Sequence, residues 1–126
     1  MPLLLLLDEN IDVRLSPMLA PYGAKTIRDM NWLGKSNGEL MRLIVEQGFN
    51  IFITTDKNLP FQQNLSALKY ALWVLDTPSN DFQTLQLFVP AILNQLAQAD
   101  NNQPIQLELQ YISVAGISTG KKLKKT

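Results

Sequence analysis

The run Leu-Leu-Leu-Leu-Leu-Asp-Glu-Asn at residues 3–10 decides the fold that we predict for this chain. Five consecutive leucines followed by turn-forming residues are typical of a strand that is covered on both faces, as in a parallel sheet. The run is too short to span a bilayer, and it lacks the basic start of a signal peptide. We therefore predict a central strand over residues 3–7 and, by default, a cytoplasmic protein without a membrane partner.

Outward from this run, apolar segments with strand character alternate with helical patterns. The further predicted strands cover residues 24–27, 50–55, 71–75 and 105–112. The predicted helices cover residues 11–21, 36–48, 60–68 and 81–99. Such alternation predicts a three-layer α/β/α sandwich with a mainly parallel central sheet.

Local signals refine three of these elements. Ser36 and Glu39 match an N-terminal capping box, and Gly48 is typical of a helix C-terminus. Pro90 predicts that the last helix either kinks or divides into two pieces. Residues 105–112 alternate apolar and polar side chains, which is typical of a strand at the edge of a sheet.

The length of 126 residues and the 46% of hydrophobic residues suit a single domain, which we place over residues 1–119. The formal net charge is zero, but four of the 11 basic residues are lysines among the last six residues. Without these four lysines the chain has a net charge of about −4, because all 11 acidic residues remain. We predict that residues 120–126 form a basic, disordered tail.

Two residue types are missing, and their absence excludes several classes of active site. The chain has no cysteine, so disulfides, thiolate metal sites and cysteine nucleophiles are excluded. It also has no histidine, which excludes histidine triads and the common zinc sites. A hydrolase with these residues would most naturally use carboxylates and Mg²⁺ or Mn²⁺.

Acidic residues follow three of the predicted strands directly: Asp8, Asp56 and Asp76. Ligand sites in parallel α/β sheets lie beyond the carboxyl ends of the strands, so we expect these side chains to converge. Glu39 could join them from the first turn of its helix. Clustered carboxylates repel one another unless a divalent cation neutralises them, and a bound cation can activate water for phosphodiester cleavage.

In their order and spacing, these residues also resemble a known family. The matching pieces are Leu-Leu-Asp-Glu-Asn-Ile at residues 6–11, Gly23, Gly34, Glu39, and Ile-Thr-Thr-Asp-Lys-Asn-Leu at residues 53–59. Over residues 3–76 the chain resembles the small PIN-like proteins described as toxin components, which are relatives of the VapC-type PIN ribonucleases. The resemblance implies a PIN-like α/β/α fold, Mg²⁺ or Mn²⁺, an RNA substrate, an antitoxin partner and, as in many such proteins, a homodimer.

The resemblance also implies roles for single residues. Asp8 matches the metal-binding aspartate of the first strand, Asp56 the aspartate of the Thr-x-Asp turn, and Glu39 the helical acid, so these three are the implied catalytic residues. Asn58 stands where such proteins often have a second aspartate, which removes one carboxylate. Its amide oxygen can still bind a metal, and Asp76 is a possible replacement ligand.

Four further residues are candidates for contact with the RNA: Asn10, Thr55, Lys57 and Arg28. Lys57 and Arg28 could meet the phosphate backbone, although charged loop residues are more often simply solvated. Structural roles compete elsewhere too, since Asn10 could cap a helix and the capping box already accounts for Glu39. We expect Trp32 and Trp73 to be packing residues.

Two other hypotheses remain open. One is a degenerate PIN-like domain that lost catalysis with its aspartate at position 58 and now binds another protein. The other is a flavodoxin-like or receiver-like domain in which Asp8, Glu9 and Asp56 form a phospho-acceptor pocket. We consider the latter less favoured, because the chain between Asp8 and Asp56 holds more elements than we expect for that arrangement.

Overall fold

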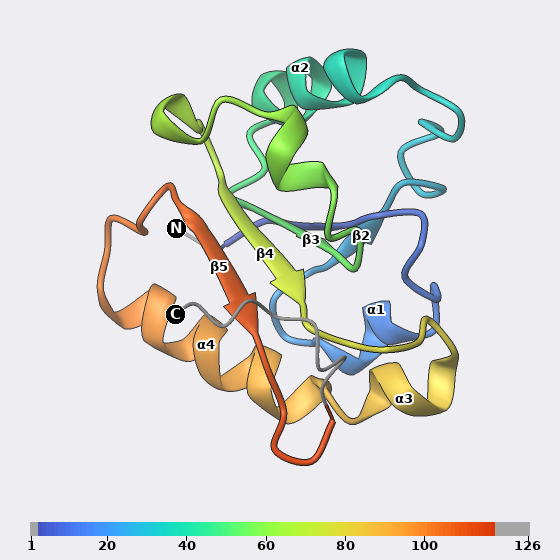
Figure 1. Ribbon diagram of the computed structural model, residues 1–126. Helices are drawn as coiled ribbons and strands as arrows, with labels where there is room; N and C mark the ends of the chain where they lie inside the picture. The colour runs from blue at the N-terminus through green and yellow to red at the C-terminus, as the bar shows by residue number, and fades with distance from the viewer. Residues whose placement is uncertain (1–2, 118–126) are drawn as a thin grey trace.

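The five strands of the computed structural model, which describes residues 3–117, form one parallel sheet (Figure 1). The strands are β1 (Leu5–Leu7), β2 (Lys25–Thr26), β3 (Ile51–Thr54), β4 (Ala71–Leu75) and β5 (Leu109–Ile112). Each strand pairs in parallel with its neighbour in the order β2-β1-β3-β4-β5. The predicted parallel sheet is therefore confirmed, as are the interior position of β1 and the edge position of β5.

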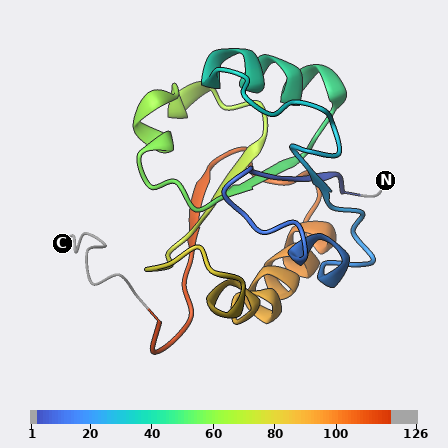
Figure 2. The ribbon, with the colours of Figure 1, turned by 90° about the vertical axis from the view of Figure 1, so that its right-hand side faces the viewer.

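Helices cover both faces of this sheet, as the two views of the ribbon show (Figures 1 and 2). The α-helices are α1 (Leu15–Met18), α2 (Asn37–Gln47), α3 (Phe82–Gln86) and α4 (Val89–Asn101). Two 3₁₀ helices, η1 (Leu59–Gln62) and η2 (Leu65–Ala67), connect β3 to β4. Because α2 lies on one face and α1, α3 and α4 lie on the other, the architecture is the predicted three-layer α/β/α arrangement.

Successive apolar side chains of the interior strands β1, β3 and β4 alternate between two separate hydrophobic cores. Leu5 and Leu7 of β1 pack with the core beneath α1, α3 and α4, which includes Trp73. Leu6, between them, packs with the core beneath α2, which includes Trp32. All three leucines are fully buried, and both tryptophans pack in the cores as predicted.

Prolines account for the differences between two predicted helices and the helices of the structure. The predicted helix 11–21 is wrong in length, since α1 spans four residues. Pro17 lies in the first turn of α1 and lacks the N–H that a helix beginning at residue 11 would need at this position, and Pro21 disfavours helical backbone in the residue before it. Pro90 likewise lies in the first turn of its helix, α4, where no N–H is required, and the predicted helix 81–99 divides into α3 and α4.

Side-chain hydrogen bonds account for the other boundaries. The single helix predicted over residues 60–68 is wrong, because the Asn64 side chain accepts a hydrogen bond from the Ser66 N–H (3.2 Å) and starts a separate turn, η2. The α2 boundaries are confirmed: Ser36 Oγ accepts from the Glu39 N–H (3.2 Å), and Gly48 ends the helix with φ of 78°. β5 is shorter than the predicted strand 105–112.

The strand order places a topological switch point between β1 and β3. From β1 the chain crosses through α1 to β2 on one side, whereas from β3 it proceeds to β4 on the other side. This is the strand order of flavodoxin-like sheets, whose ligands bind at the switch point. The elements between Asp8 and Asp56 therefore do not argue against a flavodoxin-like arrangement, and this expectation is corrected.

The structure bears on the C-terminal tail and on membrane-spanning helices only within the residues that it describes. The predicted basic tail, residues 120–126, lies outside the described residues. Within residues 3–117, no helix is long and apolar enough to cross a membrane.

Candidate functional site

Asp8 and Asp56 stand at the carboxyl ends of the two strands that meet at the switch point. Leu7 of β1 pairs with Ile53 of β3, and the Asp8 N–H continues the ladder by donating to the Ile53 carbonyl (2.9 Å). Asp56 follows two residues after the end of β3. These two acids therefore follow adjacent parallel strands and lie at the same rim of the sheet, as expected.

Thr54, the last residue of β3, links the two aspartates. Its hydroxyl donates to Asp8 Oδ2 (2.6 Å) and accepts from the Asp56 N–H (3.0 Å). Thr54 is fully buried, so its hydroxyl depends on these partners. The sequence prediction missed this residue, although a threonine in an otherwise apolar strand was a signal that pointed to it.

The surroundings of Asp8 disfavour its negative charge. Burial raises the pKa of the Asp8 carboxyl, and the nearby charges of Glu9 and Asp56 raise it further. Hydrogen bonds from the Thr54 hydroxyl and the Glu9 N–H lower the pKa and offset part of this rise. A positive ion in this place would remove the repulsion, so Asp8 and Asp56 together favour a cation.

Asn10 and Asn58 hold the two strand-end turns rather than meeting each other. Asn10 Oδ1 accepts from the Thr55 N–H (3.3 Å), and its Nδ2 donates to Thr54 Oγ1 (3.4 Å). The Asn58 N–H donates to Asp56 Oδ1 (2.9 Å) and closes the turn after β3. Asn58 itself is exposed. Asn10 thus connects the loop after β1 to the loop after β3.

Lys57 and Asp76 form an ion pair at the carboxyl end of the next strand, β4. Lys57 Nζ lies 2.7 Å from Asp76 Oδ1 and 3.4 Å from the Thr77 carbonyl oxygen. The Asp76 side chain is 2% exposed and that of Lys57 is 33% exposed. Asp76 is therefore at the predicted rim, but a lysine rather than Asp8 or Asp56 meets its carboxylate.

A cleft of about 490 Å³ opens at this rim, between the loops that follow β1, β3 and β4. Its lining consists of Asn10, Thr55, Asp56, Lys57, Thr77, Pro78 and Asn80. Four of these seven were predicted as site residues, whereas Thr77, Pro78 and Asn80 were not. Their loop follows β4, and no motif in it indicates that these residues line the same cleft as Asn10.

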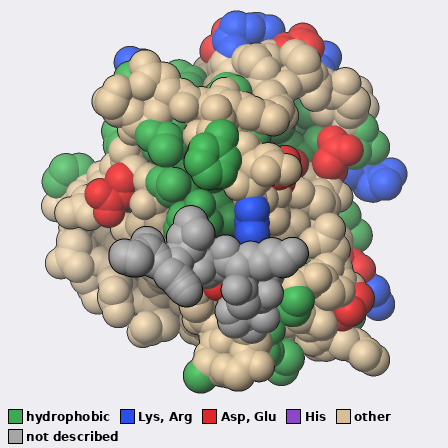
Figure 3. Space-filling view, in the orientation of Figure 1, with side chains coloured by type: hydrophobic (Ala, Val, Ile, Leu, Met, Phe, Trp, Pro, Cys, Tyr) green, Lys and Arg blue, Asp and Glu red, His purple; other side chains and the backbone are tan. Residues whose placement is uncertain are grey.

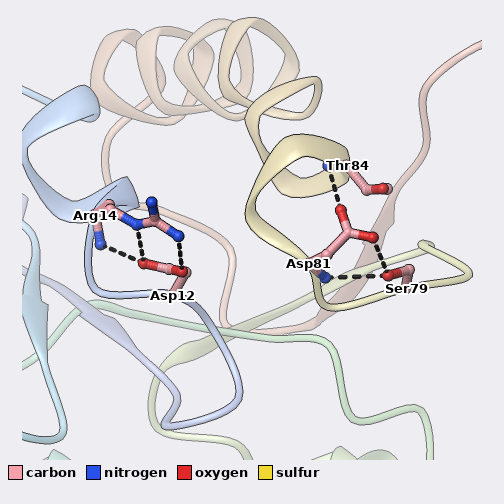
Figure 4. A network of polar contacts seen from close by, with 5 residues as sticks. All are labelled: Asp12, Arg14, Ser79, Asp81 and Thr84. Carbon is pink, nitrogen blue, oxygen red and sulfur yellow. Dashed lines mark hydrogen bonds and ion pairs between the residues drawn. The ribbon is translucent and has the colours of Figure 1, made fainter.

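Two polar networks stabilise the loops beside this cleft (Figure 4). After β1, Arg14 binds both carboxylate oxygens of Asp12 (3.0 and 2.7 Å) and lies 4.0 Å from the ring centre of Phe82 in α3. Before α3, Asp81 accepts from the Ser79 hydroxyl (2.6 Å) and from the Thr84 N–H (2.8 Å). These contacts fix the two loops that carry Asn10 and Asn80.

Glu39 pairs with two basic side chains of its own segment, and Arg28 lies at the rim of the sheet without lining the cleft. The Glu39 carboxylate faces Lys35 (3.5 Å) and Arg42 (3.9 Å), and its backbone N–H is held by the helix cap. Arg28 is exposed in the loop after β2, beside the carboxyl end of β1. Among residues 3–117, no three or more acidic side chains are grouped so that they could hold one metal ion. The five predicted metal ligands are thus not gathered into one set.

The donors that do come together still suit a hard divalent cation. Asp8 and Asp56 supply two interacting carboxylates, and Mg²⁺ commonly binds proteins through one or two carboxylates while keeping several waters. The site offers no sulfur or imidazole ligand, since the chain lacks cysteine and histidine. The residues present therefore fit Mg²⁺ or Mn²⁺ better than zinc or copper.

The chain matches no protein-family model, no curated protein and no solved structure.

Proposed function

We propose that this protein is an Mg²⁺- or Mn²⁺-dependent ribonuclease, the toxin of a toxin–antitoxin pair, and that its site lies at the carboxyl ends of β1 and β3. The observation that carries the proposal is the convergence of Asp8 and Asp56 at the switch point, where their charges repel each other. The PIN-like resemblance of residues 3–76 supports RNA as the substrate and an antitoxin as the partner. Asp8 and Asp56 are also among the residues that carry this resemblance.

Each residue of the site has a distinct part in this proposal. Asp8 and Asp56 would hold the cation, and the Thr54 hydroxyl would orient the Asp8 carboxylate toward it. The bound cation would supply charge neutralisation at the phosphate and would lower the pKa of a water molecule. Asn10 would keep the Thr55 backbone in place at the cleft, and Lys57 would meet a phosphate of the RNA.

The direct test measures cleavage of a labelled single-stranded RNA by the purified protein with and without Mn²⁺. We expect cleavage that EDTA abolishes and that Asp8→Asn and Asp56→Asn remove. Mn²⁺ binding, followed by the paramagnetic resonance of the free ion, should be lost in the same two variants. A wild-type protein that neither binds Mn²⁺ nor cuts RNA would disprove the proposal.

A degenerate domain that binds a protein partner is the second candidate, and two observations favour it. The described residues hold no three-acid group, and Asn58 carries no charge. In addition, Phe61 is 83% exposed, and apolar side chains gather over β4 and β5 on the face shown in Figure 3. If wild type is inactive and Asn58→Asp cleaves RNA, this candidate replaces the ribonuclease.

The strand order also admits the phospho-acceptor hypothesis, in which Asp56 would be phosphorylated. Incubation with acetyl phosphate and Mg²⁺, followed by mass spectrometry, separates this hypothesis from the other two. A gain of one phosphoryl group that Asp56→Asn abolishes would support it, and an unmodified protein would rule it out.

A further inference from the structure

The ion pair of Lys57 and Asp76 carries one inference beyond the proposed ribonuclease, on which it rests. The sequence suggests Asp76, which follows β4, as a possible replacement for the carboxylate that is missing at position 58. We infer instead that Asp76 is a positioning residue, which holds the Lys57 ammonium group at the cleft so that it binds a phosphate of the RNA backbone. The assignment changes which step depends on Asp76: RNA binding instead of cation binding.

The burial of Asp76 argues against a direct contact with a cation. Its side chain is 2% exposed, whereas a hydrated Mg²⁺ or Mn²⁺ ion would need open access to the carboxylate. Lys57 Nζ already donates a hydrogen bond to Asp76 Oδ1 at 2.7 Å. A divalent ion at this carboxylate would have to displace the lysine or lie beside its positive charge.

The geometry of Lys57 leaves it able to bind an anion. An ammonium group has three N–H donors. One is directed to Asp76 Oδ1 and a second, at 3.4 Å, to the Thr77 carbonyl oxygen. Lys57 also lines the cleft beside Asp56, so its third donor is available to a ligand there.

The charge of the cleft explains why such a group is needed. Asp56 lines the cleft, and Asp8 and Glu9 lie close to it, so an RNA phosphate meets repulsion there. Lys57 is the only basic residue among the seven described residues that line the cleft. A phosphate contact by one lysine also makes binding salt-dependent, with a slope of roughly 0.7 per contact for a single strand.

The test compares RNA and Mn²⁺ binding in Asp76→Asn, Lys57→Met and Lys57→Arg. We expect Asp76→Asn to raise KM for single-stranded RNA about tenfold, as for one charge-assisted hydrogen bond, and to leave Mn²⁺ affinity within about twofold of wild type. Lys57→Met should raise KM by the same factor, and both variants should lose the salt dependence that the lysine contact contributes. Lys57→Arg should recover part of the lost RNA binding. Lys69→Met and Asp100→Asn, on exposed residues elsewhere, serve as charge-matched controls.

Each contrary result has its own meaning. If Asp76→Asn weakens Mn²⁺ binding as much as Asp8→Asn does, Asp76 is a cation ligand and the inference is overturned. It is equally overturned if wild type cleaves RNA and the KM of Lys57→Met is unchanged. Should wild type neither bind Mn²⁺ nor cleave RNA, it is the proposed ribonuclease that fails. If Asp76→Asn does not fold, as judged by circular dichroism, the two Lys57 variants decide alone.

Discussion

The carboxyl ends of β1 and β3 differ from the carboxyl end of β4, although aspartates follow all three strands. At β1 and β3, Asp8 and Asp56 have no ion-pair partner among the described residues, and hydroxyl and backbone groups are their hydrogen-bond donors. At β4, Asp76 is paired with Lys57. The difference teaches that a strand-end acid indicates a cation site only where the fold leaves its charge uncompensated.

The largest effect should follow from removing the charge at β1 and β3. We expect Asp8→Asn and Asp56→Asn each to reduce RNA cleavage by about two orders of magnitude or more, because the cation loses one of its two carboxylates. Steady-state cleavage and Mn²⁺ titration measure the loss. Glu46→Gln, an exposed change on α2, is the matched control and should cleave as wild type does.

Breaking the pair at β4 should reduce stability instead. Lys57→Met leaves the Asp76 carboxylate buried without its ammonium partner, and we expect the free energy of unfolding to fall by about 2–4 kcal/mol. Urea denaturation measures this change. The double variant with Asp76→Asn should recover most of the loss, because no buried charge remains; a double variant as unstable as the single one would refute this explanation.

Removal of the Thr54 hydroxyl tests what holds the acids at β1 and β3. Thr54→Val keeps the shape of the side chain but leaves the Asp56 N–H and Asp8 Oδ2 without this partner, which should cost about 1–3 kcal/mol of stability. Thr54→Ser retains the hydroxyl and should lose far less. Equal stability of the two variants in thermal unfolding would show that the hydroxyl is not needed.

The pH dependence of Mn²⁺ binding gives a smaller, graded effect. Since the pKa of Asp8 is raised, protons compete with Mn²⁺ at a higher pH than for an aspartate of the ordinary value 3.8, and we expect affinity to begin to fall there. The raised pKa also means that the folded state takes up this proton more readily than the unfolded state, so Asp8 itself does not drive acid unfolding. A binding profile that stays flat down to the ordinary value would contradict the expectation.

The smallest effect should come from Glu39. Its carboxylate pairs with Lys35 and Arg42 at the surface, so Glu39→Gln should change stability by less than about 1 kcal/mol and leave Mn²⁺ affinity unchanged. Isothermal titration measures the affinity. A loss of Mn²⁺ binding as large as that of Asp8→Asn would instead place Glu39 in the site, as the PIN-like resemblance implies.

Most of the fold could be predicted because it depends on local patterns. The leucine run at residues 3–7 indicated a strand buried on both faces, and the Ser36 cap and Gly48 gave the boundaries of α2. The apolar spacing over residues 11–21 predicts a longer helix than α1, because periodicity alone does not register Pro17 and Pro21. Local backbone chemistry overrode periodicity there.

By itself, the sequence determined the alternation of strands and helices, the burial of β1 and the acids that follow three strands. Only the tertiary structure decided the partner of each acid, because side chains far apart along the chain meet at the rim of the sheet. Thr54 lies 46 residues from Asp8, and Lys57 lies 19 residues from Asp76. Those contacts decide whether the charge of an acid stays uncompensated and can attract a cation. The strand order creates the contacts, and no local sequence pattern specifies them.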